Sequence, residues 1–342
     1  MSDFDYIQKN TPPELPEKFK AALLPENIKK NRYTDVLAND DTRVKLNNNG
    51  YINANYIFQG RMIASQAPTI ETIPDFLQMI IEQQVPIVVM LTKCKEKTRT
   101  KATPYWGYKS EGGKKVFGKY TVNTIDTLYD DIEEDKFMED IQIRYLQIIY
   151  EDGVYSFIQI HYMGWPDFGV PSNPKDALDL VYIQYIIGTT SKFSNRNLIC
   201  VHCSAGVGRT GVYCLLSRII EMVTYEILEK SETYSKQRST SSSSKVREVE
   251  DRIEEILLSH PVISYEDCEV ILPELVLSMR NERSKMVQTK EQYDFICETV
   301  NCFYEDALDS ISQYYEVIDA LTPLLQEKHS EIVQDFIKRN EF

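Results

Sequence analysis

The chain contains two short, unbroken runs of apolar residues, at positions 85–91 and 198–201. A strand that is apolar at every position is typical of the centre of a sheet that is covered on both faces. Residues 141–149 and 154–162 instead alternate apolar and polar side chains on either side of Asp152-Gly153. This alternation around a turn signal predicts a β-hairpin.

From Arg209 onward the apolar spacing becomes helical, and one face would hold Val212, Leu215, Leu216, Ile219, Ile220 and Val223. Residues 51–57 alternate and follow the turn signal Asn49-Gly50, so they predict another strand. This mixture of strands and helices predicts an α/β fold: a single domain with a large, twisted, mixed β-sheet flanked by helices.

Three further segments have patterns of their own. Residues 231–245 are rich in Ser and Thr and predict a disordered surface loop. Residues 246–258 have helical spacing, so the insertion at about 231–260 is predicted to carry its own helix. Residues 305–342 also have a helical apolar stripe, which suggests the hypothesis that a C-terminal helix docks on the domain.

With 42% hydrophobic and 26% charged residues, the 342-residue chain has the composition of a soluble globular protein. Its longest apolar run is far shorter than the ~20 residues of a membrane-spanning helix. The first ten residues lack the basic start and apolar stretch of a signal peptide. Seven irregularly spaced cysteines indicate reduced thiols, so we expect a cytoplasmic protein, or a nuclear one, without membrane insertion.

The net charge of −14 argues against nucleic acid as the main partner. It does not exclude an anionic substrate, because distant surface charges are screened beyond about 8–10 Å at physiological salt. An arginine about 4 Å from a phosphate contributes about 4 kcal/mol per unit charge at an effective dielectric near 20. Local geometry can therefore outweigh the global charge.

Residues 198–211, LICVHCSAGVGRTG, carry the most informative pattern, a buried strand that leads through a loop of small residues into a helix. Such a loop turns successive backbone N–H groups inward at a helix N-terminus, where an anion binds. Gly206 and Gly208 permit positive φ and close approach of an anion, and Arg209 supplies a fork for two phosphate oxygens. A free cysteine with a pKa near 8.5 is only about 3% ionised at pH 7, and these surroundings favour the thiolate of Cys203.

The same segment also matches two other motifs. Residues 206–211 match G-x-G-x-x-G, and Glu226 and Glu229 lie where a dinucleotide site needs an acid. Those glutamates fall within or just beyond the helix, however, and a Ser-rich stretch follows where a second strand is required. Cys200-x-x-Cys203 also matches a redox pair. Cys200 is then either a buried strand residue or a thiol that traps oxidised Cys203 as a disulfide.

His202-Cys203, five residues and then Arg209 resemble the signature of the protein tyrosine phosphatase superfamily, which dual-specificity and lipid phosphatases share. The rest of the chain resembles the phosphotyrosine-specific, non-receptor branch over about residues 27–301. The matching segments are NIKKNRY (27–33), DDTRVKL (40–46), YINANYI (51–57), QAP (66–68), WPDFGVP (165–171), HCSAGVGRTG (202–211) and QTKEQYDF (288–295).

The resemblance implies a catalytic role for five residues. Cys203 resembles the nucleophile that forms a cysteinyl-phosphate intermediate, and Arg209 the residue that stabilises the transition state. Asp167 resembles the general acid for the leaving tyrosine oxygen and the base for the hydrolytic water. Gln288 resembles the residue that positions this water, and Thr210 the hydroxyl that helps the thiolate to leave.

It also implies a substrate pocket for phosphotyrosine-containing proteins. Tyr33 resembles the aromatic wall that makes the pocket too deep for phosphoserine, and Asp35 the carboxylate that binds substrate backbone amides. Gln292 resembles an assistant to the water-positioning glutamine, and Lys101 a cation near the Asp167 loop. The loop residues that would surround the phosphate are Ser204, Ala205, Gly206, Val207 and Gly208.

Two residues resemble supporting ones: Glu96 would orient Arg209, and His202 would fix the loop beside Cys203. The chain also departs from the family pattern. Thr34 stands where some members carry Arg and Lys285 where some carry Gly, which leaves a second phosphotyrosine pocket and the peptide preference open. Leu77, Ala102 and Gly107 replace other common residues without removing a catalytic group.

The resulting domain plan is an N-terminal segment (1–26), a phosphatase catalytic domain (27–303) and a C-terminal helical tail (304–342). We expect a monomer that needs no cofactor and no metal. A catalytically dead phosphotyrosine-binding module would have lost one of Cys203, Arg209 or Asp167, and all three are present. A dual-specificity or phosphoinositide phosphatase would not match the Tyr33 and Gln288 segments. A scaffold role through the C-terminal helix remains open as an addition.

Overall fold

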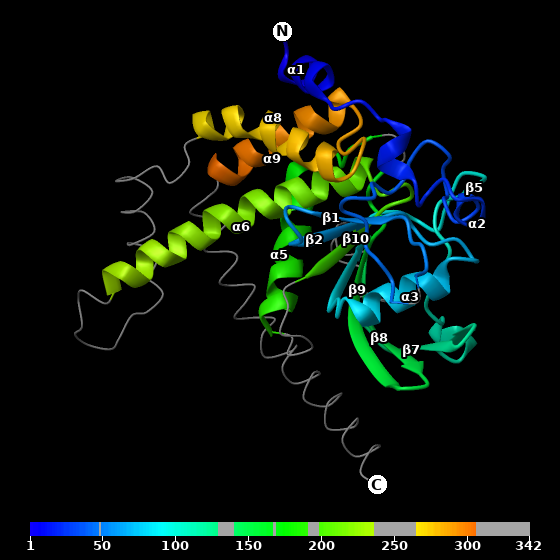
Figure 1. Ribbon diagram of the computed structural model, residues 1–342. Coiled ribbons are helices and arrows are strands. Elements are labelled where there is room, and N and C mark those ends of the chain that lie inside the picture. Colours follow the sequence, from blue (N-terminus) through cyan, green and yellow to red (C-terminus); the bar gives the residue numbers. More distant parts are fainter. Residues whose placement is uncertain (48, 129–139, 167–168, 191–197, 236–264, 306–342) are drawn as a thin grey trace, which may run out of the picture.

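The computed structural model describes residues 1–47, 49–128, 140–166, 169–190, 198–235 and 265–305 (Figure 1). One eight-stranded sheet with the order β1-β2-β10-β3-β9-β8-β7-β6 forms its centre. Neighbouring strands from β2 to β9 are parallel, and the other pairs are antiparallel, which confirms the predicted mixed sheet. Its strands are β1 (Ala54–Ile57), β2 (Met62–Ser65), β3 (Ile87–Met90), β6 (Lys114–Phe117), β7 (Tyr120–Leu128), β8 (Ile141–Tyr150), β9 (Gly153–Tyr162) and β10 (Ile199–His202).

Helices cover both faces of this sheet, with α5, α6 and α9 packed together on one face and α3 on the other (Figure 1). The α-helices are α1 (Asp3–Asn10), α2 (Pro25–Ile28), α3 (Ile73–Glu82), α5 (Pro174–Thr190), α6 (Gly208–Ser235), α8 (Tyr265–Glu282) and α9 (Lys290–Glu305). Shorter elements are the 3-10 helices at Pro16–Phe19 and Lys109–Glu111 and the two-stranded ribbon of β4 (Lys95–Glu96) and β5 (Arg99–Thr100).

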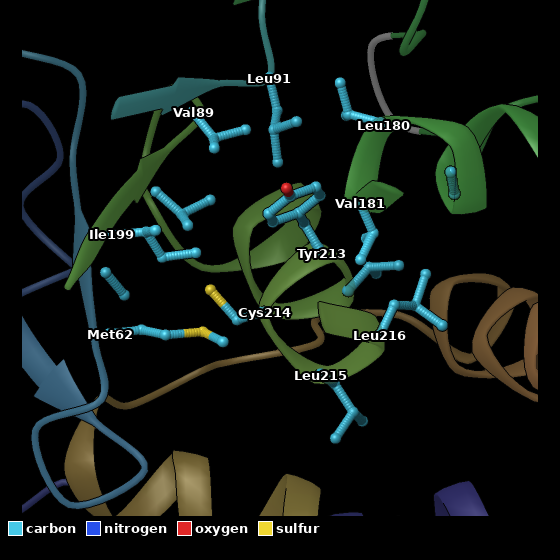
Figure 2. Packing of buried hydrophobic residues seen from close by; sticks show 14 of the residues in the cluster. Met62, Val89, Leu91, Leu180, Val181, Ile199, Tyr213, Cys214, Leu215 and Leu216 are labelled. Atoms are coloured by element: carbon cyan, nitrogen blue, oxygen red, sulfur yellow. The ribbon is translucent and has the colours of Figure 1, made fainter. Parts of the chain in front are cut away.

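The central strands are apolar throughout because both of their faces are buried. In β3, Ile87 and Val89 belong to the core under α5 and α6, whereas Val88 and Met90 belong to the core under α3. Figure 2 shows the first core, which lies between the sheet and the helices α5 and α6 and to which α6 contributes Tyr213, Cys214, Leu215 and Leu216. The prediction of two central buried strands is therefore confirmed.

The predicted hairpin is confirmed as well. Strands β8 and β9 pair antiparallel from Tyr150↔Gly153 to Ile141↔Tyr162. Gly153 has a φ of +149°, a conformation that suits glycine in the turn.

Two expectations need correction. The strand predicted at 51–57 begins only at Ala54, because Tyr51 and Asn53 turn their polar groups to Asn31 in the preceding segment. The loop predicted at 231–245 starts too early, since residues 231–235 continue α6 as helix. Residues 236–264, with the helix predicted at 246–258, and residues 306–342 lie outside the described part of the chain.

The parallel strands β3 and β10 both end at the same edge of the sheet, at Met90 and His202. Ligands in α/β folds bind beyond the carboxyl ends of such strands. The loop between β10 and α6 lies at this edge.

Candidate active site

The loop at residues 203–208 is held against the sheet by close backbone packing. Gly206 has a φ of +75°, and an added Cβ would lie 2.0 Å from the carbonyl oxygen of Ser65. The amide of Ala67 donates to the carbonyl of Ser204 at 3.0 Å. Only glycine combines this φ with this approach, so residue 206 fixes the path of the loop.

Gly208 does not use the positive φ that glycine permits, and a second feature of its surroundings requires a small residue. It is the first residue of α6, and its φ is not in the left-handed region. An added Cβ would lie 2.7 Å from Oε1 of Gln288, and one at Gly211 would lie 2.6 Å from the amide of Val287. The absence of side chains here lets the Gln288 segment approach the loop.

Cys203 is buried at the start of the loop, and the amide of Gly206 donates to its sulfur at 3.3 Å. Burial raises the pKa of this thiol, but the charge of Arg209 and the donors of Thr210 and Gly206 outweigh burial and hold the pKa below its usual value. The Thr210 hydroxyl is buried beside Cys203 and is one of the groups that lower the pKa of its thiol. The site therefore favours a thiolate.

Arg209 lies buried in the first turn of α6, where two groups fix its guanidinium. It forms a two-pronged ion pair with Glu96, with N–O distances of 2.7 and 3.1 Å, and donates to the carbonyl of Leu91 at 3.1 Å. Glu96 also accepts from the hydroxyl of Thr92 at 3.0 Å. Glu96 thus sits where the resemblance implied, against the arginine.

Lys101 is buried although the cationic residues before it, Lys93, Lys95, Lys97 and Arg99, are exposed. Its ammonium lies 3.7 Å from Glu96. The structure therefore separates Lys101 from the surface cluster of its neighbours in sequence.

His202 is fully buried behind Cys203. Its Nε2 lies 3.0 Å from the hydroxyl of Tyr105, and its Nδ1 lies 3.1 Å from the carbonyl oxygen of Cys203. Burial lowers the pKa of His202 to about 4, so the ring is neutral at physiological pH. It contacts the backbone of the loop and not the sulfur.

Tyr33 joins the loop from the N-terminal part of the chain. Its hydroxyl lies 2.8 Å from Oγ of Ser204, which donates to the carbonyl of Lys101 at 2.8 Å. The ring is half-buried against the core under α5 and α6. Tyr33 thus forms one wall beside the loop.

Asp35 lies further out and is mostly exposed. Lys285 donates both to its carboxylate, at 3.1 Å, and to its carbonyl oxygen. The same ammonium lies 3.8 Å from Glu14. An ion pair therefore links the Tyr33 segment to the Gln288 segment at the rim.

Gln288 and Gln292 come together at the start of α9. The amide of Gln288 donates to Oε1 of Gln292 at 2.8 Å. Both side chains lie beside Gly208, where an added Cβ would come within 3 Å of each. Gln288 and Gln292 thus flank the loop at residues 203–208.

Asp167 lies outside the described residues, but both ends of its segment are placed. Trp165 is buried in the core under α5 and α6, and its indole N–H donates to the carbonyl of Gly169 at 3.1 Å. Gly169 approaches Glu291 of α9. The ends of the segment are therefore anchored close to Gln288 and Gln292.

Sequence reasoning missed Arg283, which is fully buried. It donates to the carbonyls of Gly206 and Ala205, at 2.7 and 3.0 Å, and to the side chains of Asn55 and Asn53, at 2.7 and 2.9 Å. These bonds hold the carbonyls of residues 205 and 206 toward Arg283, while the amide of Gly206 points to the Cys203 sulfur. A single arginine after a helix has no periodic signal, and only the fold reveals its partners.

Cys200 and Cys203 are both free thiols. Cys200 belongs to the core under α3, whereas Cys203 belongs to the core on the opposite face of the sheet. Burial raises the pKa of Cys200 far above its usual value. This agrees with the interpretation of Cys200 as a buried strand residue.

The described residues do not gather three His, Cys, Asp or Glu side chains as a metal site. Within the same ranges, each helix is too short or too polar to cross a membrane. A buried thiol with a lowered pKa, a loop amide directed at its sulfur and a fixed guanidinium at a helix N-terminus form a site that suits a tetrahedral oxyanion and its attack by a sulfur nucleophile.

Comparison with known proteins agrees with this chemistry. A family model described as protein-tyrosine phosphatase matches residues 27–246. The chain therefore belongs to the protein-tyrosine phosphatase family, and similar solved structures include the catalytic domain of one of its non-receptor members.

Among curated relatives, human tyrosine-protein phosphatase non-receptor type 18 is 31% identical over 308 residues, which cover 87% of this chain and 56% of the relative. Mouse tyrosine-protein phosphatase non-receptor type 4 is 32% identical over 318 residues, covering 90% and 28%. The chain thus spans about half, or less, of the length of these relatives.

Solved structures show the same fold. The catalytic domain of human protein tyrosine phosphatase non-receptor type 18 has a TM-score of 0.64 and 29% identity, with 88% of this chain and 95% of that chain covered. PTPN18 in complex with HER2 phosphopeptides has a TM-score of 0.65 at the same identity, covering 88% and 98%.

Proposed function

We propose that this chain is a protein tyrosine phosphatase that hydrolyses phosphotyrosine in proteins through a cysteinyl-phosphate intermediate. The observation that carries the proposal is the buried Cys203 sulfur, which accepts from the amide of Gly206 next to an Arg209 guanidinium held by Glu96, in surroundings that lower the pKa of the thiol. This arrangement supplies both the nucleophile and the charge that phosphoryl transfer needs.

In the first step the Cys203 sulfur attacks phosphorus, so that a P–S bond forms as the bond to the tyrosine oxygen breaks. Arg209 and the amides of residues 204–208 stabilise the charge on the phosphoryl oxygens. A phenol with a pKa near 10 is a poor leaving group as an anion at pH 7. Asp167, by resemblance, donates the proton it needs.

In the second step water attacks the phosphocysteine, and the P–S bond breaks to release phosphate and the thiolate. Asp167 accepts the proton of the water, and Gln288, supported by Gln292, positions it. The Thr210 hydroxyl stabilises the departing thiolate, in keeping with its place beside the sulfur.

In this proposal the depth of the pocket selects phosphotyrosine over phosphoserine. Tyr33 stands over the loop through its contact with Ser204, so a phosphate must reach past an aromatic wall. Asp35 keeps one carboxylate oxygen for substrate amides while Lys285 binds the other. Lys101 acts as a cation at the side of Glu96. The occupancy of PTPN18 by HER2 phosphopeptides supports phosphotyrosine-containing proteins as partners.

We assign catalysis to residues 27–303, with residues 1–26 as an N-terminal segment and 304–342 as a helical tail. We place the protein in the cytoplasm as a monomer that acts on proteins and not on nucleic acid.

The test is initial phosphate release from matched phosphotyrosyl and phosphoseryl peptides, with Cys203→Ser as the inactive control. We expect rapid, Cys203-dependent release from the tyrosyl peptide alone. Equal rates on both peptides would indicate dual specificity. Tight peptide binding without release would indicate a binding module.

A further inference from the structure

Arg144 of β8 is a buried cation in the interior of the sheet, with 6% of its surface exposed. Its guanidinium lies 4.5 Å from the centre of the Trp106 ring. It donates to Oε1 of Gln159 at 2.9 Å and to Nδ1 of His161 at 3.2 Å. Both acceptors lie on the neighbouring strand β9, and two chains of hydrogen bonds continue from them.

The first chain leads to the nucleophile. Gln159 donates through Nε2 to the hydroxyl of Tyr105 at 2.7 Å, and Tyr105 lies 3.0 Å from Nε2 of His202. His202 in turn lies 3.1 Å, through Nδ1, from the carbonyl of Cys203. Every link of this chain is buried.

The second chain leads to the phosphate-binding arginine. His161 lies 2.9 Å, through Nε2, from the carbonyl of Thr92, whose hydroxyl donates to Glu96 at 3.0 Å. Glu96 holds Arg209, and the adjacent Leu91 carbonyl accepts from Arg209 as well.

The direction of both chains follows from the chemistry of Arg144. A guanidinium has donors only, so Oε1 of Gln159 and Nδ1 of His161 must accept. The Gln159 amide then points its NH₂ to Tyr105, the Tyr105 hydroxyl donates to Nε2 of His202, and the remaining proton of His202 lies on Nδ1, facing the Cys203 carbonyl. By the same rule His161 carries its proton on Nε2 and donates to Thr92.

We infer that Arg144 is a positioning residue that sets the orientation of both the Cys203 backbone and the Arg209 guanidinium through two separate buried hydrogen-bond chains. This inference rests on the proposed phosphatase site but concerns the geometry that prepares it. Without the arginine, the amide and imidazole groups of both chains can adopt either orientation, and each buried link that is then left unmatched is costly.

Variants that interrupt one hydrogen-bond chain at a time separate the effects of the two hydrogen-bond chains. Gln159→Met breaks only the chain to Cys203, His161→Leu breaks only the chain to Arg209, and Arg144→Met breaks both. Gln184→Met is the matched control, because Gln184 is a buried glutamine that binds Ser217 outside both chains. Arg144→Lys keeps the charge but lacks the planar fork.

Two readouts avoid phosphatase substrates, so they stand even if the proposed function fails. The pH dependence of iodoacetamide alkylation of Cys203 gives the pKa of its thiol. Protection against alkylation by inorganic phosphate gives the affinity of the oxyanion site. Circular dichroism and thermal melting confirm that each variant is folded.

We expect Gln159→Met to raise the thiol pKa by about half a unit or more, with phosphate affinity changed by less than twofold. His161→Leu should weaken phosphate binding about fivefold or more, with a smaller effect on the thiol pKa. Arg144→Met, or Arg144→Lys if the former does not fold, should show both effects. The inference is overturned if folded Gln159→Met and His161→Leu leave both readouts as in Gln184→Met, or if the two variants change them identically.

Discussion

At Gly206 the backbone φ is +75°, and the place of a Cβ is taken by the carbonyl of Ser65. We expect Gly206→Ala to abolish phosphate binding and lower the thermal midpoint, because the strained φ costs about 1–3 kcal/mol and the overlap with fixed backbone adds to it. Gly112→Ala is the control, since Gly112 has a φ of +85° but open space around its Cβ. Equal losses in both variants, measured by calorimetry, would show that the close approach to Ser65 has no effect.

Glu96 holds Arg209 by two short ion-pair contacts in a buried site. We expect Glu96→Gln to lower kcat/KM on a phosphotyrosyl peptide about tenfold or more, because a charged hydrogen bond contributes about 1.5–3 kcal/mol. Glu221→Gln, which removes the partly exposed ion pairs with Arg218 and Arg61 far from Cys203, should change kcat/KM by less than twofold. Steady-state kinetics on the two folded variants measures this difference. Similar values of kcat/KM for both variants would contradict the role of Glu96.

At the scale of elements, the site is assembled from segments that are far apart along the chain. The β10–α6 loop is supported by the end of β2 and by Arg283, which follows α8. The start of α9 approaches the loop where Gly208 and Gly211 have no side chains. This requirement for close approach explains why small residues recur in the loop.

One ion pair joins two segments at the rim of the site. Lys285 links the segment before α9 to Asp35. We expect Lys285→Met to raise KM for a phosphotyrosyl peptide about threefold with little change in kcat, because exposed ion pairs are weak and salt-screened. Lys285→Arg should restore KM, and Lys290→Met, which breaks an exposed pair with Asp294, should leave it unchanged. A fall in kcat at constant KM would place Lys285 in the chemical step instead.

For the whole molecule, two buried histidines make folding sensitive to acid. Burial lowers the pKa of His202 to about 4 and that of His161 to about 3. The unfolded chain binds these protons below a pKa near 6.5, whereas the folded chain does not. The contribution of these neutral histidines to the unfolding free energy is therefore fully present above pH 6.5. As the pH falls below this value, the unfolding free energy decreases by up to about 1.4 kcal/mol per pH unit for each histidine.

Urea unfolding between pH 7 and pH 5.5 measures this slope while most carboxylates stay ionised. We expect the unfolding free energy to fall across this range, and to fall less steeply in His161→Leu. An unfolding free energy that stays constant or rises toward pH 5.5 would contradict neutral, buried histidines in the folded state.

The sequence by itself determined the features that depend on local pattern. The unbroken apolar runs predicted the central strands, the alternation around Asp152-Gly153 predicted the hairpin, and the spacing after Arg209 predicted α6. The strand-loop-helix segment at 198–211 also located the oxyanion site, because Cys203, Gly206 and Arg209 lie within seven residues and their geometry is set by local backbone.

Only the tertiary structure decided how distant residues act on that site. Arg283, Arg144 and Ser65 have no motif, since their roles come from hydrogen bonds and packing across more than 70 positions of the chain or between strands. Gly208 does not use positive φ, and its contacts with Gln288 and Gln292 could not be predicted, because the fold brings these side chains to it from a distant part of the chain. The direction of a buried hydrogen-bond chain is likewise fixed by which donors and acceptors the packed core places in contact.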